Sequence, residues 1–157
     1  MVQVQSEFLL KSPEDTEHFA RFLAAELAAG DVVLLSGGIG AGKTHLARAA
    51  ILALLETPED VPSPTFTLVQ TYDTLKGELW HADLYRLTDT SELIELGLTD
   101  AFDEAISFVE WPDRLGSLCP PNALTLDIKL ADDDDARRIS AHSTSARWAF
   151  VKDYSAK

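Results

Sequence analysis

The chain has 157 residues, of which 46% are hydrophobic and 25% are charged, an ordinary composition for a single globular domain spanning 1–157. Its formal net charge of −13, from 26 acidic and 13 basic residues, argues against a broad surface for nucleic-acid phosphates. With Cys119 as its single cysteine, the chain has neither a disulfide framework nor a cysteine-based metal site. The first residues lack a basic region followed by a long apolar run, so we expect no signal peptide, no membrane span and a cytoplasmic location.

A strand and a helix are predicted at the amino terminus. Polar and apolar residues alternate weakly from Val2 to Leu10, which favours a strand. Ser12 can cap the helix that follows, and Pro13 suits its first position. We expect this helix to run to about Ala29 and to end at Gly30.

The sequence GGIGAGKT at residues 37–44 matches G-x-x-x-x-G-K-[ST], the phosphate-binding P-loop. Residues 31–36 before it are predicted to form a buried strand, and residues 44–55 after it a helix. Backbone N–H groups of such a loop, together with the positive end of the helix dipole, bind an anion. Lys43 can then reach the β- and γ-phosphates, and the Thr44 hydroxyl can ligate Mg²⁺. The motif predicts a site for a purine nucleoside triphosphate with Mg²⁺.

A proline-rich loop and a hairpin are predicted next. Two prolines within residues 61–66 exclude a central strand, so this segment should be a constrained loop. Its hydroxyls suit either a switch that senses the γ-phosphate or a simple connector. Residues 67–72 and 78–82 read as two strands joined by a turn over 73–77.

The remaining expected elements are shorter. Helical segments are expected over 91–96, closed by Gly97, and over 101–104, followed by a buried strand over 106–111. Late strands over 124–130 and 137–142 should be joined by a solvated acidic loop at 132–135, and a last helix is expected over 143–151.

Two acids near strand ends are candidates for the chemistry. Glu110 ends the apolar ISFV strand and could hold Mg²⁺ directly or through water. Asp83 could orient or deprotonate an attacking water, or bind a metal-bound water, and the residues alone do not decide which acid positions the water. Period-two alternation places His81 on the same face as Asp83, where we expect a packed histidine. Arg86 suits either a phosphate contact or a structural ion pair.

Taken together, these motifs resemble the TsaE (YjeE) family, small ATPases of bacterial tRNA threonylcarbamoyladenosine synthesis. The resemblance spans about residues 31–115 and is carried, in order, by GGIGAGKT, VPSPTFTLVQTY, HADLYRL, ELIELGL and FVEWPDRL. It implies an α/β P-loop NTPase three-layer fold with a mostly parallel central sheet, with the hairpin as an addition. It also implies that the chain acts with TsaB-like and TsaD-like proteins, the latter being the threonylcarbamoyl transferase, and resets that complex by hydrolysing ATP.

The resemblance also implies site residues. Lys43, Asp83 and Glu110 would be catalytic, and Thr44 and Glu110 would hold Mg²⁺. The nucleotide-binding residues would be Ser12 and Thr16 on the adenine side, Gly38, Ile39, Gly40, Ala41, Gly42, Lys43 and Thr44 in the loop, Thr65 in the switch-like segment, and Trp111. Two residues depart from the family pattern: Gly38 replaces an acid, and Ala82 replaces a bulky aromatic residue.

Three functions agree with these features. The first is an accessory ATPase with low activity alone, because the chain has a P-loop and two acids but no evident arginine-rich lid. The second is a small-molecule kinase in which Asp83 deprotonates an acceptor hydroxyl. The third is a binding module in which ATP only shapes the proline-rich loop for docking. The absence of an N/T-K-x-D motif argues against a GTPase, and the negative net charge argues against direct tRNA binding.

Overall fold

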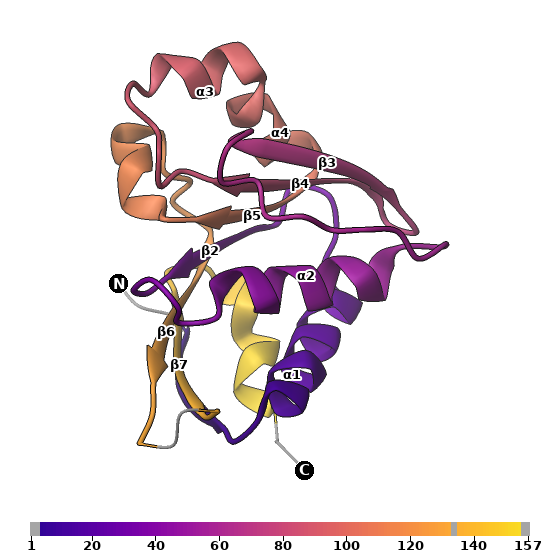
Figure 1. Ribbon diagram of the computed structural model, residues 1–157, viewed down its shortest axis with the longest axis vertical. Coiled ribbons are helices and arrows are strands. Elements are labelled where there is room, and N and C mark those ends of the chain that lie inside the picture. Colours follow the sequence, from indigo (N-terminus) through magenta and orange to yellow (C-terminus); the bar gives the residue numbers. More distant parts are fainter. Residues whose placement is uncertain (1–3, 133–134, 155–157) are drawn as a thin grey trace.

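The computed structural model describes residues 4–132 and 135–154, which form a sheet in the order β1-β7-β6-β2-β5-β4-β3 (Figure 1). The strands are β1 (Val4–Leu10), β2 (Val32–Ser36), β3 (Val69–Thr74), β4 (Gly77–Asp83), β5 (Ile106–Glu110), β6 (Leu124–Leu130) and β7 (Arg137–Ser143). The central neighbours β6, β2, β5 and β4 pair in parallel, whereas β1, β7 and β3 pair antiparallel at the two sides. The expectation of a mostly parallel central sheet with a hairpin is therefore confirmed.

Helices cover both faces of the sheet and complete three layers (Figure 1). One face carries α1 (Pro13–Glu26), α2 (Lys43–Leu54) and the 3₁₀ helix η2 (Ala146–Asp153). The other face carries α3 (Ser91–Leu96), α4 (Leu98–Glu104) and the 3₁₀ helix η1 (Pro112–Leu118). Among the helices of the described residues, none is long and apolar enough to cross a membrane.

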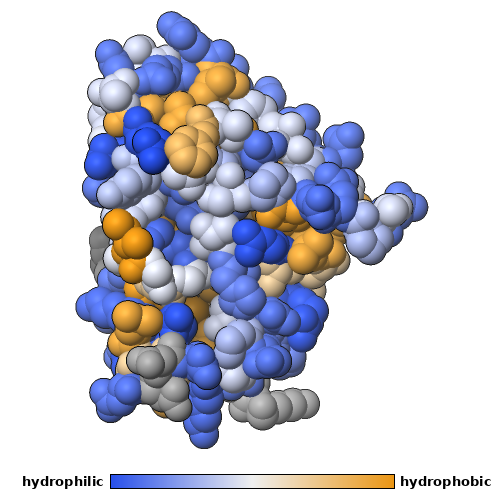
Figure 2. All heavy atoms as spheres, in the orientation of Figure 1, coloured by the Kyte–Doolittle hydropathy of each residue, from blue (hydrophilic) through white to orange (hydrophobic). Residues whose placement is uncertain are grey.

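Strand β2 reads as an unbroken apolar run because both of its faces are buried. Val33 and Leu35 pack into the core on the side of α1 and α2, while Val32 and Leu34 pack into the core on the opposite side. The core therefore lies on both sides of β2 and positions the loop that follows this strand. On the face shown in Figure 2, hydrophilic residues cover most of the surface and hydrophobic residues gather in separate patches.

Helix α1 ends at Glu26, three residues earlier than the sequence predicts. Leu27 is already extended and buried, and the Ala28 N–H donates to the Asp31 carboxylate at 2.8 Å. This side-chain contact competes with further helical hydrogen bonds and explains the early end. Lys76, from the β3–β4 turn, donates to the carbonyls of Ala24 and Ala25 and so caps the carboxyl end of the helix, although it is distant in sequence.

Strand β3 begins at Val69 rather than at Thr67. Leu68 has a φ of 67°, and its N–H donates to the Pro64 carbonyl at 2.8 Å, so the chain turns there before it becomes extended. The strand then continues to Thr74, and the turn before Gly77 is shorter than expected. The proline-rich segment forms no strand, as predicted.

The carboxy-terminal segment is helical as expected, but it forms a 3₁₀ helix. The acidic loop predicted at 132–135 lies partly outside the described residues, as does the predicted strand start at residues 2 and 3.

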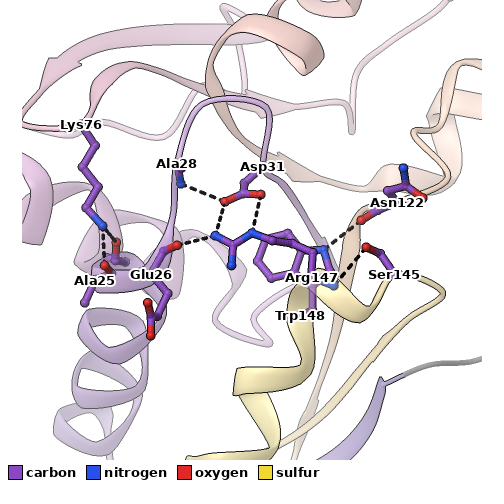
Figure 3. Close-up of polar contacts among 10 residues, drawn as sticks. Ala25, Glu26, Ala28, Asp31, Lys76, Asn122, Ser145, Arg147 and Trp148 are labelled. Atoms are coloured by element: carbon purple, nitrogen blue, oxygen red, sulfur yellow. Dashed lines mark hydrogen bonds and ion pairs between the residues drawn. The ribbon is translucent and has the colours of Figure 1, made fainter.

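An ion pair joins η2 to the start of β2 (Figure 3). Arg147 donates from Nε and Nη2 to the two Asp31 carboxylate oxygens, at 3.1 and 2.7 Å, and also to the Glu26 carbonyl. The hydrogen bonds to the Asp31 carboxylate raise the pKa of Arg147. Next to it, Trp148 donates its indole N–H to the Asn122 carbonyl at 2.8 Å. The contacts fix the carboxy-terminal helix at the end of the sheet opposite the P-loop.

We expect Arg147→Met to lower the free energy of unfolding by about 1.5 kcal/mol, because the nearly buried Asp31 carboxylate loses its charged partner. The guanidinium is partly exposed, which keeps the loss near the lower end for charged hydrogen bonds. Urea unfolding measures the change, and Lys152→Met, an exposed position in the same 3₁₀ helix, is the control. Equal stability of the two variants would contradict a structural role for the pair.

Candidate nucleotide-binding site

The loop at residues 37–42 turns between β2 and α2 on glycines with positive φ. Gly40 and Gly42 have φ values of 80° and 104°, which disfavour a side chain. Gly42 is the N-cap of α2, and no side chain among the described residues caps this end of the helix. The first amides of α2 are therefore available to bind an anion.

Lys43 is buried and held close to this loop. Its Nζ donates to the Gly37 and Gly38 carbonyls at 2.8 Å each, and lies 4.1 Å from the centroid of the Trp111 ring. Burial lowers the pKa of Lys43, while the negative charges of Glu110 and Asp83 act in the opposite direction. A cation in this position suits a phosphate ligand.

Glu110 connects the P-loop helix to the sheet. One carboxylate oxygen accepts from the Thr44 hydroxyl at 2.8 Å, and the other lies 2.7 Å from His81 Nε2. Glu110 is only 2% exposed and His81 is fully buried. The two residues proposed from sequence as Mg²⁺ ligands, Thr44 and Glu110, are thus in direct contact.

Asp83, at the end of β4, connects the sheet to the proline-rich loop. Its carboxylate accepts from the Thr65 hydroxyl at 3.0 Å and from the Tyr85 N–H at 3.0 Å. Ser63 lies 2.7 Å from the same Thr65 hydroxyl. The proline-rich loop is therefore tied to Asp83 through the Thr65 hydroxyl.

Trp111 follows Glu110 in a left-handed conformation, with φ of 59° and ψ of 54°. This is an uncommon conformation for an aromatic residue. It directs the backbone out of β5, and the ring packs against Tyr85 with 4.9 Å between centroids. The aromatic pair forms one wall of the site, and the Lys43 ammonium lies over one of its rings.

These residues surround one cleft of about 390 Å³. It is lined by Ile39, Gly40, Gly42, Lys43, Thr44, His45, Thr65, Asp83, Tyr85, Glu110 and Trp111. The structure therefore brings together all three residues predicted to be catalytic.

A smaller, mostly apolar cavity of about 160 Å³ adjoins the cleft and shares Gly42 and His45 with it. It contains the predicted residues Thr16 and Ala41, and its remaining lining is Pro13, Leu46, Ile128, Asp135, Arg137 and Ile139. Ser12 lies outside this lining, and its hydroxyl accepts from the Asp15 N–H as the cap of α1. Gly38 lies outside both linings, on the side of the loop next to β6.

Sequence reasoning missed His45 and Tyr85. His45 directly follows Thr44 at the start of α2, so its position relative to the motif could have identified it. Tyr85 follows Asp83 in the HADLYRL stretch but carries no chemistry that marks it as a wall residue. Arg86, whose role was left open, lies over the exposed Phe66 ring at 4.5 Å.

The residues of the cleft fit Mg²⁺ as a cofactor. Among the described residues, no group of three or more His, Cys, Asp or Glu side chains could hold a metal ion by itself. Mg²⁺ in phosphate-binding sites uses only one or two protein oxygens together with waters and phosphate oxygens. The Thr44 hydroxyl and the Glu110 carboxylate supply such a set.

The steric surroundings of the two adjacent glycines predict opposite tolerance to substitution. In Gly37→Ala the new Cβ would lie 2.4 Å from the Ile128 carbonyl oxygen, at a φ of 145°, so the loop must shift. In Gly38→Asp the Cβ meets nothing within 4 Å, so the departure from the family's acid is sterically neutral. We expect Gly37→Ala to weaken ADP binding at least about 10-fold and Gly38→Asp to leave it nearly unchanged. Isothermal titration calorimetry tests this, and equal affinities would contradict the close contact.

Nucleotide affinity should fall as pH rises, because phosphate binding needs the Lys43 ammonium. Burial lowers the pKa of Lys43 from 10.5, so the free protein loses this charge at a lower pH than an exposed lysine would. ADP affinity measured between about pH 7.5 and 10 should therefore decline before the ordinary lysine range is reached. A flat profile up to the ordinary lysine pKa would show that the ammonium is not the titrating partner.

A P-loop between a buried strand and a helix, on a mostly parallel sheet with helices on both faces, defines a P-loop NTPase-type protein. The sequence model described as "Threonylcarbamoyl adenosine biosynthesis protein TsaE" matches residues 10–139. The chain belongs to the TsaE family, which acts in tRNA threonylcarbamoyladenosine biosynthesis.

Individual relatives agree with this assignment. The chain is 38% identical to the TsaE protein of Rickettsia bellii over 85% of this chain and 93% of that protein. It is 38% identical to TsaE of Bacillus subtilis over 89% of this chain and 87% of that protein. The crystal structure of Bacillus subtilis YdiB superposes with a TM-score of 0.80 at 30% identity, over 98% of this chain and 94% of that one.

Proposed function

We propose that residues 1–157 form an ATPase domain that binds and hydrolyses ATP as an accessory subunit in tRNA threonylcarbamoyladenosine synthesis. It would act on a TsaB/TsaD-type transferase complex and permit that complex to turn over repeatedly. One observation carries the proposal: Lys43, Asp83 and Glu110 line the same cleft, and each acid is bonded to a hydroxyl of a different loop or helix. Because the pathway modifies tRNA, we expect a cytoplasmic location.

Each side chain has a defined role in this proposal. The P-loop amides and Lys43 would bind the phosphates of ATP, and the adjoining apolar cavity suits the adenine ring. Mg²⁺, held by Thr44 and Glu110, would neutralise phosphate charge. Asp83 would orient the water whose oxygen attacks the γ-phosphorus while the bond to the β–γ bridging oxygen breaks. Release of phosphate would alter the contact of Thr65 with Asp83 and so the shape of the proline-rich loop.

Low activity of the isolated chain follows from the cleft's charges. Lys43 is the one Lys or Arg side chain among the described residues that line the cleft. P-loop ATPases and GTPases gain about 10³–10⁵-fold in rate from an arginine that stabilises the transition state. We therefore expect a partner to supply or organise the missing stabilisation. Little direct contact with tRNA is expected, because the chain carries a net charge of −13.

The test is ATP hydrolysis by the purified chain, alone and with TsaB-like and TsaD-like proteins. We expect a weak rate that rises with the partners and collapses in Asp83→Ala and Glu110→Ala. If the partners change nothing and phosphate is transferred to a metabolite, the small-molecule kinase function is favoured. If Glu110→Gln loses hydrolysis but still supports the cellular function, the chain is a nucleotide-dependent binding module.

A further inference from the structure

His81 is a buried polar residue that the proposed reaction does not yet use. It lies on β4 two residues before Asp83, so both side chains point to the same face of the strand. Its exposure is 0%, and its Nε2 lies 2.7 Å from Oε2 of Glu110. A polar ring in this position is costly to bury unless its hydrogen bonds are satisfied.

The contact with Glu110 is the ring's only polar interaction with the described part of the chain. A carboxylate accepts hydrogen bonds and does not donate them, so the Nε2–H of His81 is the donor. His81 Nδ1 is buried and finds no hydrogen-bond partner among the described residues. Among the described residues, the ring therefore hydrogen-bonds to Glu110 alone.

Glu110 is consequently held at both of its oxygens. The Thr44 hydroxyl donates to Oε1 at 2.8 Å, and His81 donates to Oε2 at 2.7 Å. The parallel pairing of β4 with β5 sets this geometry, because Asp83 is registered with Glu110 and His81 with Phe108. A carboxylate fixed at both ends loses little conformational freedom when it binds a cation.

We propose that His81 is a positioning residue for Glu110. It orients the carboxylate so that Oε1 and the Thr44 hydroxyl both serve a divalent cation, and thereby it sets the affinity of the cleft for that cation. This inference rests on the proposed role of Glu110 as a metal ligand. Removing a residue that hydrogen-bonds a metal ligand typically weakens metal affinity by about 10–100-fold.

Two amide substitutions separate positioning from simple structural support. In His81→Gln the side-chain amide reaches the place of Nε2 and can still donate to Glu110. In His81→Asn the amide reaches only the place of Nδ1 and cannot. Both variants keep a polar amide at the same buried position, so each is the other's control for stability, which urea unfolding measures.

The probe is Mn²⁺, titrated into each protein with saturating β,γ-imido-ATP and followed by the relaxation of water protons. We expect His81→Asn to raise the Mn²⁺ half-saturation concentration about 10-fold or more and His81→Gln to restore it to near the wild-type value. Equal half-saturation in the wild type and His81→Asn, or an equal loss in both variants, would overturn the inference. Glu110→Gln is measured in parallel. If its Mn²⁺ affinity matches that of the wild type, Glu110 is not a metal ligand, and the proposed role of Glu110 is contradicted separately from that of His81.

Discussion

Asp83→Asn should lower partner-stimulated ATP hydrolysis by about 100-fold or more while leaving ADP affinity nearly unchanged. Asparagine keeps the shape of the side chain and an oxygen that can accept from the Thr65 hydroxyl or the Tyr85 N–H. It lacks the negative charge that would orient and activate the attacking water. The variant thus separates the chemical step from nucleotide binding.

Steady-state phosphate release in the presence of the partner proteins measures this effect. The matched control is Asp73→Asn, which makes the same chemical change at an exposed position on the edge strand β3. Hydrolysis by Asp83→Asn at the wild-type rate would assign water positioning to Glu110 instead. A parallel loss of ADP affinity would show that Asp83 supports the fold of the site and not the reaction.

Lys43→Met should weaken ADP and ATP binding by about 100–1,000-fold, which corresponds to about 3–4 kcal/mol. The reason is the loss of charge-assisted hydrogen bonds to phosphate, which no other lysine or arginine among the described cleft residues can replace. Stability should not fall in the same way, because burial already disfavours the charged form of Lys43.

Calorimetric titration with ADP measures the loss, and Lys152→Met reproduces the change in net charge at an exposed position far along the chain. An affinity within a few-fold of the wild type would mean that the loop amides bind the phosphates without the ammonium. Thermal unfolding of the same proteins separates this result from a folding defect.

Motifs with a fixed local geometry were the most predictable part of the molecule. The P-loop demands a strand before it and a helix after it, so β2, α2 and the positions of Lys43 and Thr44 at the start of that helix could be predicted from eight residues. Glu110 could be placed because an acid at the carboxyl end of an apolar parallel strand lies at the same sheet edge as the loop. In the structure, Lys43, Thr44 and Glu110 line the same cleft.

Features that depend on contacts distant in sequence could not be predicted. Lys76 donates to the Ala24 carbonyl at the end of helix α1 from 52 residues further along the chain, and this contact does not follow from local propensity. The bond between His81 and Glu110 joins two strands, so the sequence alone suggested only a packed histidine. Trp111 was placed beside the site, but its left-handed backbone was not foreseen because nothing in VEWP requires it.

The most direct test of the account is the number of threonylcarbamoyl groups transferred to tRNA per TsaB/TsaD-type complex in the presence of ATP. The reaction is run without this chain, with the wild type, and with Asp83→Asn. We expect repeated turnover with the wild type and a single round without the chain or with Asp83→Asn. Repeated turnover with Asp83→Asn, in a preparation shown to lack ATP hydrolysis, would contradict the claim that hydrolysis by this chain resets the complex.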